Sequence, residues 1–148
     1  MTMWRELIQE LGEDVGFDPP ASSLQVAEVE EALQVALPND LKELLREANG
    51  VWALYGTALV WSTERIIKEN LEYRTFPNFK ELYMPFDPLL FFGDEGNGDL
   101  YAFLILAGKI RGSNIFLWDH ETGSRRWYAF GLQRYLEMRI AADRGEPT

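Results

Sequence analysis

The amino-acid sequence predicts an α+β domain in which an antiparallel sheet packs against N-terminal helices and a C-terminal helix. Apolar residues recur at helical spacing in the first third of the chain, short apolar runs joined by glycine-containing turns follow, and helical spacing returns near the C-terminus. Helices and strands segregated in this way are typical of α+β folds, and short turns imply antiparallel pairing. We expect about four to six strands, a usual number for one sheet. Residues 1–148 are expected to form a single domain.

Three helices are expected in the first third of the chain, over residues 2–11, 24–35 and 38–49. Ser22 or Ser23 can cap the second helix, because a serine hydroxyl accepts a hydrogen bond from a free N–H of the first turn. Pro38 suits the first turn of the third helix, since the N–H that proline lacks would have no partner there. Asn49 and Gly50 end this helix, with Gly50 as the left-handed residue.

The pattern changes to that of strands after Gly50. Residues 55–61 are rich in strand-forming residues, and Ser62 can cap a short helix behind them. Residues 76–88 contain three prolines and are expected to cross the fold irregularly. The remaining elements expected are strands over 89–92, 100–107, 115–118 and 126–130, and a last helix over 132–141. The strand over 100–107 is apolar on both faces and is expected at the centre of the sheet.

Two glycine-containing turns join these strands. The first is GDEGNGD, residues 93–99, in which Gly93 and Gly98 permit the bend. Asn97 and Gly98 both tolerate positive φ, which a tight hairpin turn requires. The second is DHETGS, residues 119–124. Turns on a stiff sheet are common places for binding residues.

The chain is strongly acidic, and the charge is unevenly placed. The formal net charge is -10, of which residues 1–50 contribute -8, residues 51–100 contribute -4 and residues 101–148 contribute +2. Such a surface repels nucleic acid and attracts a basic protein. The alternative is that the acidity only keeps the protein soluble.

Several classes of site are not expected. The chain has no cysteine and one histidine, so a zinc site of the usual kind is not predicted. His120 stands near Asp119 and Ser124 in the sequence, but neighbouring residues at a strand end point in different directions, and no catalytic triad is predicted. Calcium at residues 93–99 is a minor alternative, because the segment lacks the ligand pattern of an EF-hand loop. We expect no cofactor, no metal and no enzymatic activity.

The sequence gives no sign of a membrane or secreted protein. No apolar run approaches the ~18 residues of a membrane span, and the acidic start does not resemble a signal peptide. The lack of cysteine fits a reducing compartment. A cytoplasmic location is therefore expected.

Three segments in order resemble the SUKH superfamily. They are LPNDLKELLREANGVW (37–52), LLFFGDEGNGDLYAFLI (89–105) and NIFLWDHETGS (114–124). The likeness covers about residues 22–138. The superfamily comprises fungal cell-wall-regulator domains and many bacterial immunity proteins, and the resemblance implies an α+β fold that binds protein. It implies that the chain neutralises a bacterial toxin, possibly a nuclease, by covering its active surface. The alternative is a regulatory scaffold of the fungal type.

The candidate contact residues lie on the two turns. Carboxylates there can meet basic side chains of a partner, and a tryptophan beside them could add an aromatic contact. An alternative for Asp99 and Asn97 is that their side chains hydrogen-bond the backbone of the turn. The candidate partner-binding residues are Asp94, Glu95, Asp99, Trp118, Asp119 and Glu121.

Overall fold

A computed structural model describes residues 3–53, 56–143 and 145. These residues form helices and two antiparallel sheets, which confirms the predicted α+β class. Within them, no helix combines the length and apolar character needed to cross a bilayer. In chain order the elements are α1 (Met3–Leu11), β1 (Gly16–Phe17), α2 (Ser23–Leu33), α3 (Asn39–Glu47), β2 (Val51–Trp52), β3 (Ala58–Val60), α4 (Thr63–Thr75), α5 (Pro77–Leu82), β4 (Leu89–Asp94), β5 (Leu100–Leu106), β6 (Lys109–Trp118), β7 (Arg125–Phe130) and α6 (Leu132–Asp143).

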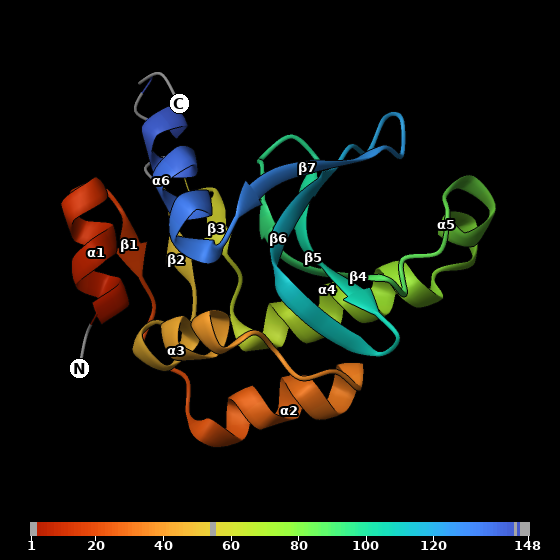
Figure 1. Ribbon diagram of the computed structural model, residues 1–148, viewed down its shortest axis with the longest axis horizontal. Coiled ribbons are helices and arrows are strands. Elements are labelled where there is room, and N and C mark those ends of the chain that lie inside the picture. The colour runs from red at the N-terminus through yellow and green to blue at the C-terminus, as the bar shows by residue number, and fades with distance from the viewer. Residues whose placement is uncertain (1–2, 54–55, 144, 146–148) are drawn as a thin grey trace.

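The two sheets meet along one pair of strands. The smaller sheet has the order β1-β2-β3 and the larger one β4-β5-β6-β7, so each strand of the larger sheet pairs with its neighbour in the sequence. The Trp61 N–H, directly after β3, donates to the Phe92 carbonyl of β4 at 2.8 Å. Figure 1 shows the smaller sheet between α1 and the larger sheet, with α5 at the opposite end of the molecule.

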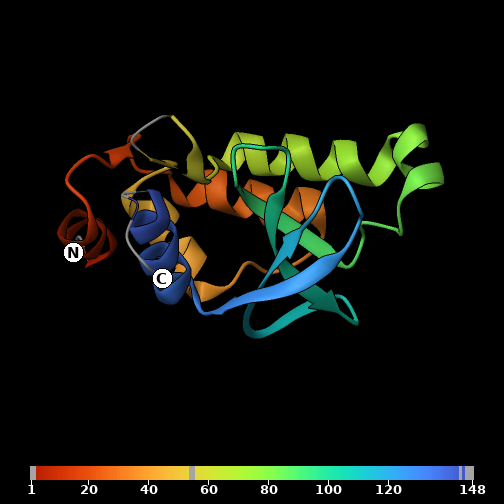
Figure 2. The same cartoon turned by 90° about the horizontal axis from the view of Figure 1, so that it is seen from above.

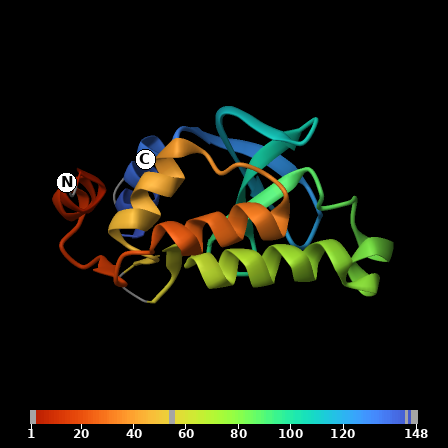
Figure 3. The same ribbon diagram turned by 90° about the horizontal axis from the view of Figure 1, so that it is seen from below.

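Helices cover both faces of the larger sheet. Figures 2 and 3 show α2 and α4 running side by side along one face. Because successive strand residues point to opposite faces, the adjacent Phe91 and Phe92 enter different halves of the core. Phe91 packs against Tyr73 of α4, with ring centroids 5.2 Å apart. Phe92 packs against Tyr135 of α6 at 5.0 Å.

The central position of β5 is confirmed for its first half. Residues 100–103 are buried at both parities, whereas Leu106 at the far end is exposed. The strand ends one residue earlier than predicted. Ala107 (φ 50°) and Gly108 (φ 75°) both adopt positive φ and form the two-residue turn into β6.

The N-terminal helices begin largely as predicted. The Ser22 hydroxyl accepts from the Gln25 N–H at 3.1 Å, and the Gln25 side chain accepts from the Ser22 N–H at 2.9 Å, which forms a capping box. Pro38 occupies the N-cap position (φ -57°, ψ 141°), so α3 starts one residue later than predicted. Gly50 has φ +126°. The Asn49 side chain accepts from the Thr63 N–H at 2.8 Å and so also helps to start α4.

Other boundaries differ from the sequence prediction. The irregular crossing predicted over residues 76–88 is wrong in part, because Pro77 lies in the first turn of α5, where proline is tolerated. The helix after Ser62 extends over 13 residues and is not short. Strand β1 was not predicted, and β6 starts six residues before its predicted boundary at residue 115. In the strand predicted over 55–61, Tyr55 lies outside the described residues.

Gly93 marks the closest approach of the two sheets. A Cβ at this position would lie 2.4 Å from the Leu59 carbonyl oxygen and 2.6 Å from the Tyr135 hydroxyl. Real Cβ atoms do not come so near to backbone, so a side chain here requires β3 and β4 to move apart. Gly93 was expected to permit the bend of the turn, but it lies within β4 and has no positive φ; a glycine is needed there for the close approach of β3.

We expect the substitution Gly93→Ala to lower the free energy of unfolding by about 3 kcal/mol, because the added methyl group forces backbone to shift. Gly16→Ala is the matched control. Its Cβ would meet only Trp52 Cβ at an ordinary 3.8 Å, and the expected change is below about 1 kcal/mol. Urea denaturation of both variants measures the difference, and equal stabilities would contradict this account.

Candidate functional site

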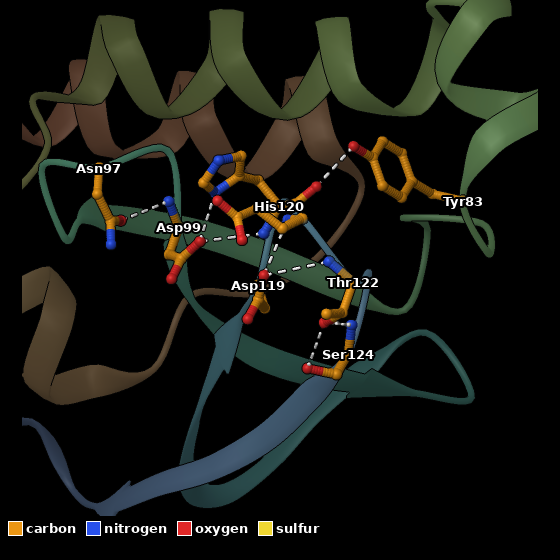
Figure 4. A network of polar contacts seen from close by, with 8 residues as sticks. Tyr83, Asn97, Asp99, Asp119, His120, Thr122 and Ser124 are labelled. Atoms are coloured by element: carbon orange, nitrogen blue, oxygen red, sulfur yellow. Dashed lines mark hydrogen bonds and ion pairs between the residues drawn. The ribbon is translucent and has the colours of Figure 1, made fainter.

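The two predicted turns lie side by side at one end of the larger sheet. β5 pairs antiparallel with β6, and Leu100 is opposite Trp118 in the register. The β4–β5 turn ends directly before Leu100 and the β6–β7 turn starts directly after Trp118. The pairing therefore forces the two turns to be neighbours, as Figure 4 shows.

His120 joins the two turns. Asp99 Oδ1 accepts from the His120 backbone N–H at 3.0 Å and lies 2.6 Å from the imidazole Nδ1. The Tyr83 hydroxyl, just after α5, donates to the His120 carbonyl at 2.9 Å. Gly98 (φ +105°) leaves room for the ring, since a Cβ there would lie 2.9 Å from Nδ1. Three segments that are distant in the sequence thus meet at one residue.

The contact between Asp99 and His120 shifts the pKa of both groups. Partial burial of Asp99 acts to raise its pKa, but the hydrogen bonds from the backbone and ring of His120 outweigh it and lower the pKa. The hydrogen bond to Asp99 raises the pKa of the imidazole. The pair is therefore most stable as a carboxylate with a protonated histidine.

The carboxylates of the β4–β5 turn are held by arginines. Asp94 Oδ2 lies 2.6 Å from Arg65 Nη2 of α4. Glu95 Oε2 accepts from the Tyr101 hydroxyl and lies 3.8 Å from Arg139 Nε. The predicted turn-building role of Asn97 is also present, because its Oδ1 accepts from the Asp99 N–H at 3.0 Å. These contacts fix the loop within the fold.

Arg139 is the buried centre of this arrangement. The residue is 6% exposed, and its guanidinium donates to the Tyr135 hydroxyl at 2.7 Å and to the Asp94 carbonyl. Its carbon Cζ lies 4.6 Å from the centroid of the Tyr101 ring. Burial raises the pKa of Tyr101 and Tyr135, so both phenols stay protonated.

The candidates of the β6–β7 turn separate into three kinds. Trp118 is 2% exposed and packs against Tyr83 and other aromatic rings, so its predicted contact role is wrong: in this fold the indole belongs to the core. Asp119 Oδ1 accepts from the N–H groups of Glu121 and Thr122 at 2.8 and 3.2 Å and builds the turn. Glu121 is exposed.

Sequence reasoning missed Arg139, Arg65 and the structural use of His120. A signal for Arg139 was present, since it lies four residues after Tyr135 on the apolar stripe of α6. A charged residue on such a stripe has to find polar partners inside the fold. Arg65 and His120 carried no comparable signal, because only the tertiary structure brings them to the turns.

A cavity of about 460 Å³ opens beside the β4–β5 turn. It lies between that turn, the larger sheet and α6. Among the residues that line it are Glu95, Asp99, Tyr101, Arg126, Tyr128 and Met138.

The geometry of the described residues gives little support to a catalytic triad or to a metal site at the two turns. His120 contacts Asp99, while the Thr122 hydroxyl donates to the Ser124 hydroxyl at 3.0 Å. Ligand atoms of Asp99, Asp119 and His120 come within 4.8 Å of one another. Of these atoms, the imidazole Nδ1 and Asp99 Oδ1 already contact each other at 2.6 Å.

We expect the contact between His120 and Asp99 to contribute less to stability as the pH rises. The folded-state pKa of His120 is above its ordinary value of 6.5, so its contribution is present below pH 6.5 and is lost as the pH passes the raised value. The contribution of Asp99, whose pKa is lowered, is lost at the acid end instead. Urea denaturation of the wild type and His120→Gln should show a larger difference at about pH 6 than at about pH 8.5. Equal differences would contradict this pH dependence.

Loss of the buried guanidinium should be costly. We expect Arg139→Met to lower the free energy of unfolding by about 2–4 kcal/mol, because the Asp94 carbonyl and the Glu95 carboxylate lose a charged donor. Arg134→Met, on the exposed side of the same helix, should change it by less than about 0.5 kcal/mol. Chemical denaturation measures both, and a small effect at Arg139 would show that the network is dispensable.

Comparison with known proteins agrees with the resemblance seen in the sequence. The family model SUKH_6, described as SMI1-KNR4 cell-wall, matches residues 23–136. No match was found among curated proteins. The matched residues are more than half of the chain and include both turns, while α1 and β1 precede them. The chain therefore belongs to the SMI1-KNR4 family of the SUKH superfamily.

Proposed function

We propose that this chain is an immunity protein, which binds a bacterial toxin domain and neutralises it by covering the toxin's active surface. The family supports a protein of this general kind and is in general non-catalytic. The proposed partner is a basic protein domain, because the chain carries a net charge of -10. A nuclease fits this description, since its substrate groove is positive and acidic side chains can occupy it in place of phosphate.

One observation supports the two turns as the contact surface: they are held together by contacts within the fold. Asp99 and His120 connect the turns, and Arg139 holds the start of the first one. A loop that is already ordered loses less conformational entropy on binding. Glu121, which is exposed, and Glu95, whose side chain is 39% exposed, supply negative charge at this surface.

Neutralisation would work by steric exclusion. The two turns lie at the end of a sheet that α2 and α4 cover on one face and α6 contacts on the other, so they form a firm edge that can enter a groove. Acidic side chains at the edge would approach a cationic groove faster than neutral ones, because opposite charges steer the encounter. The substrate would then be kept out without any chemical step.

The test is coexpression with the candidate toxin domain encoded beside this chain. We expect the wild-type chain to restore growth and to bind the purified toxin domain, with an association rate that falls about tenfold or more from low to high salt. A rate that does not depend on salt would rule out electrostatic steering. Failure to restore growth or to bind would rule out the proposed function for that pair.

Charge reversal separates the proposed surface from overall acidity. We expect Glu121→Lys to slow association several-fold, because a positive charge is placed on the turn that meets the partner. Glu28→Lys on the exposed face of α2 is the matched control, with the same change in net charge. Stopped-flow kinetics measures both, and equal slowing by the two variants would place the contact elsewhere.

A further inference from the structure

The cavity beside the β4–β5 turn has the features of a pocket for one basic side chain of the partner. This inference rests on the proposed function and names the chemistry of its contact. Two carboxylates, Glu95 and Asp99, line the cavity together with Tyr101 and Tyr128. Carboxylates above aromatic rings are a usual arrangement for binding a cation.

Each of these carboxylates makes contacts within the fold. The contacts of Glu95 fall on Oε2, and those of Asp99 with His120 fall on Oδ1. Glu95 Oε1 makes no hydrogen bond or ion pair with the described residues, whereas the Asp99 carboxylate also has a side-chain hydrogen bond with Asn97. Figure 4 shows the second oxygen of Asp99 turned away from His120. Glu95 therefore has a free acceptor atom in a fixed position, and the Asp99 carboxylate is oriented by His120 and Asn97.

The walls suit the aliphatic stem and the planar head of an arginine. The rings of Tyr101 and Tyr128 lie 4.8 Å apart at 65°, and Leu117 and Met138 add apolar surface. The Tyr101 ring already has a guanidinium at 4.6 Å on the protein side, that of Arg139. A planar fork of donors can reach two separate carboxylate oxygens, whereas an ammonium group is a single point of charge.

The positive groups near the cavity act in different ways, and His120 pairs with Asp99 and offsets part of its charge. The guanidinium of Arg139 is engaged with the Tyr135 hydroxyl, the Asp94 carbonyl and Glu95, so it is not free to bind an anion. Arg126 of β7 is exposed at the cavity, and its charge opposes a second cation. Arg126 is therefore expected to weaken the binding of a cation. Its substitution should raise the affinity, whereas substitution of a carboxylate should lower it.

We propose that this cavity receives a single arginine side chain of the partner, with its guanidinium between Glu95 and Asp99 and its stem along Tyr128 and Met138. Both carboxylates are fixed by the fold, so binding requires little rearrangement of this chain. Lysine would enter the same cavity more weakly, because it cannot bond both oxygens with one planar group.

The test is an NMR titration of the full chain with a short arginine peptide, N-acetyl-Gly-Arg-Gly-amide. We expect shifts confined to the amides of the two turns and β7, with a dissociation constant on the order of millimolar for so small a ligand. The citrulline peptide, of the same shape but without charge, should bind at least tenfold more weakly. Equal binding of the two peptides, or shifts elsewhere on the chain, would overturn the proposal.

Substitutions in the cavity test which residues bind the arginine side chain. Glu95→Gln keeps an oxygen for the Tyr101 hydroxyl, and Asp99→Asn keeps one for the His120 N–H, so both are expected to fold. Each should weaken the arginine peptide tenfold or more, Arg126→Ala should strengthen it several-fold, and Glu28→Gln should have no effect. Unchanged affinity in the two carboxylate variants would also overturn the proposal. A chain that protects cells from the toxin but does not distinguish arginine from citrulline would refute the pocket and leave the proposed function in place.

Discussion

The antiparallel pairing of β5 with β6 is the constraint on which the candidate site depends. Because Leu100 lies opposite Trp118, the turns that precede and follow these residues have to emerge together. Both residues are buried, so the pairing is held by the core as well as by backbone hydrogen bonds. The burial of Trp118 and the exposure of the adjacent turn are thus two results of the same register.

The carboxylates of the β4–β5 turn make contacts within the fold and are also partly exposed to solvent. Asp94 is paired with Arg65, and Asp99 with His120, so the turn is less anionic than its sequence indicates. Yet Glu95 and Asp99, which make these contacts within the fold, also line a cavity. Ion pairs within the fold reduce the net charge of the turn but hold the carboxylates in fixed orientations. Fixed carboxylates favour a selective contact with a basic group over long-range attraction.

Much of the fold could be predicted because local patterns agree with it. The caps at Ser22 and Ser62 and the turn at Asn97-Gly98 depend on neighbouring residues alone. The misses depend on distant contacts. Strand β1 exists because Gly16 and Phe17 find β2, and Asp99 meets His120 across 21 residues of sequence. The contact role predicted for Trp118 was wrong because a strand end next to a polar turn gives no sign of the aromatic residues that α4 and the segment after α5 place over it.

The anchoring of the β6–β7 turn has a consequence for how the family can diversify. Its first flank, Trp118, is fixed in the core, and its last, Arg125, donates to the carbonyls of Met84 and Pro85 at 2.9 and 2.8 Å. A hairpin whose two flanking residues are held by contacts with the rest of the fold tolerates substitution or insertion at its tip without loss of the sheet. Exposed positions of the tip, such as Glu121, can therefore change while His120 and the rest of the scaffold are kept.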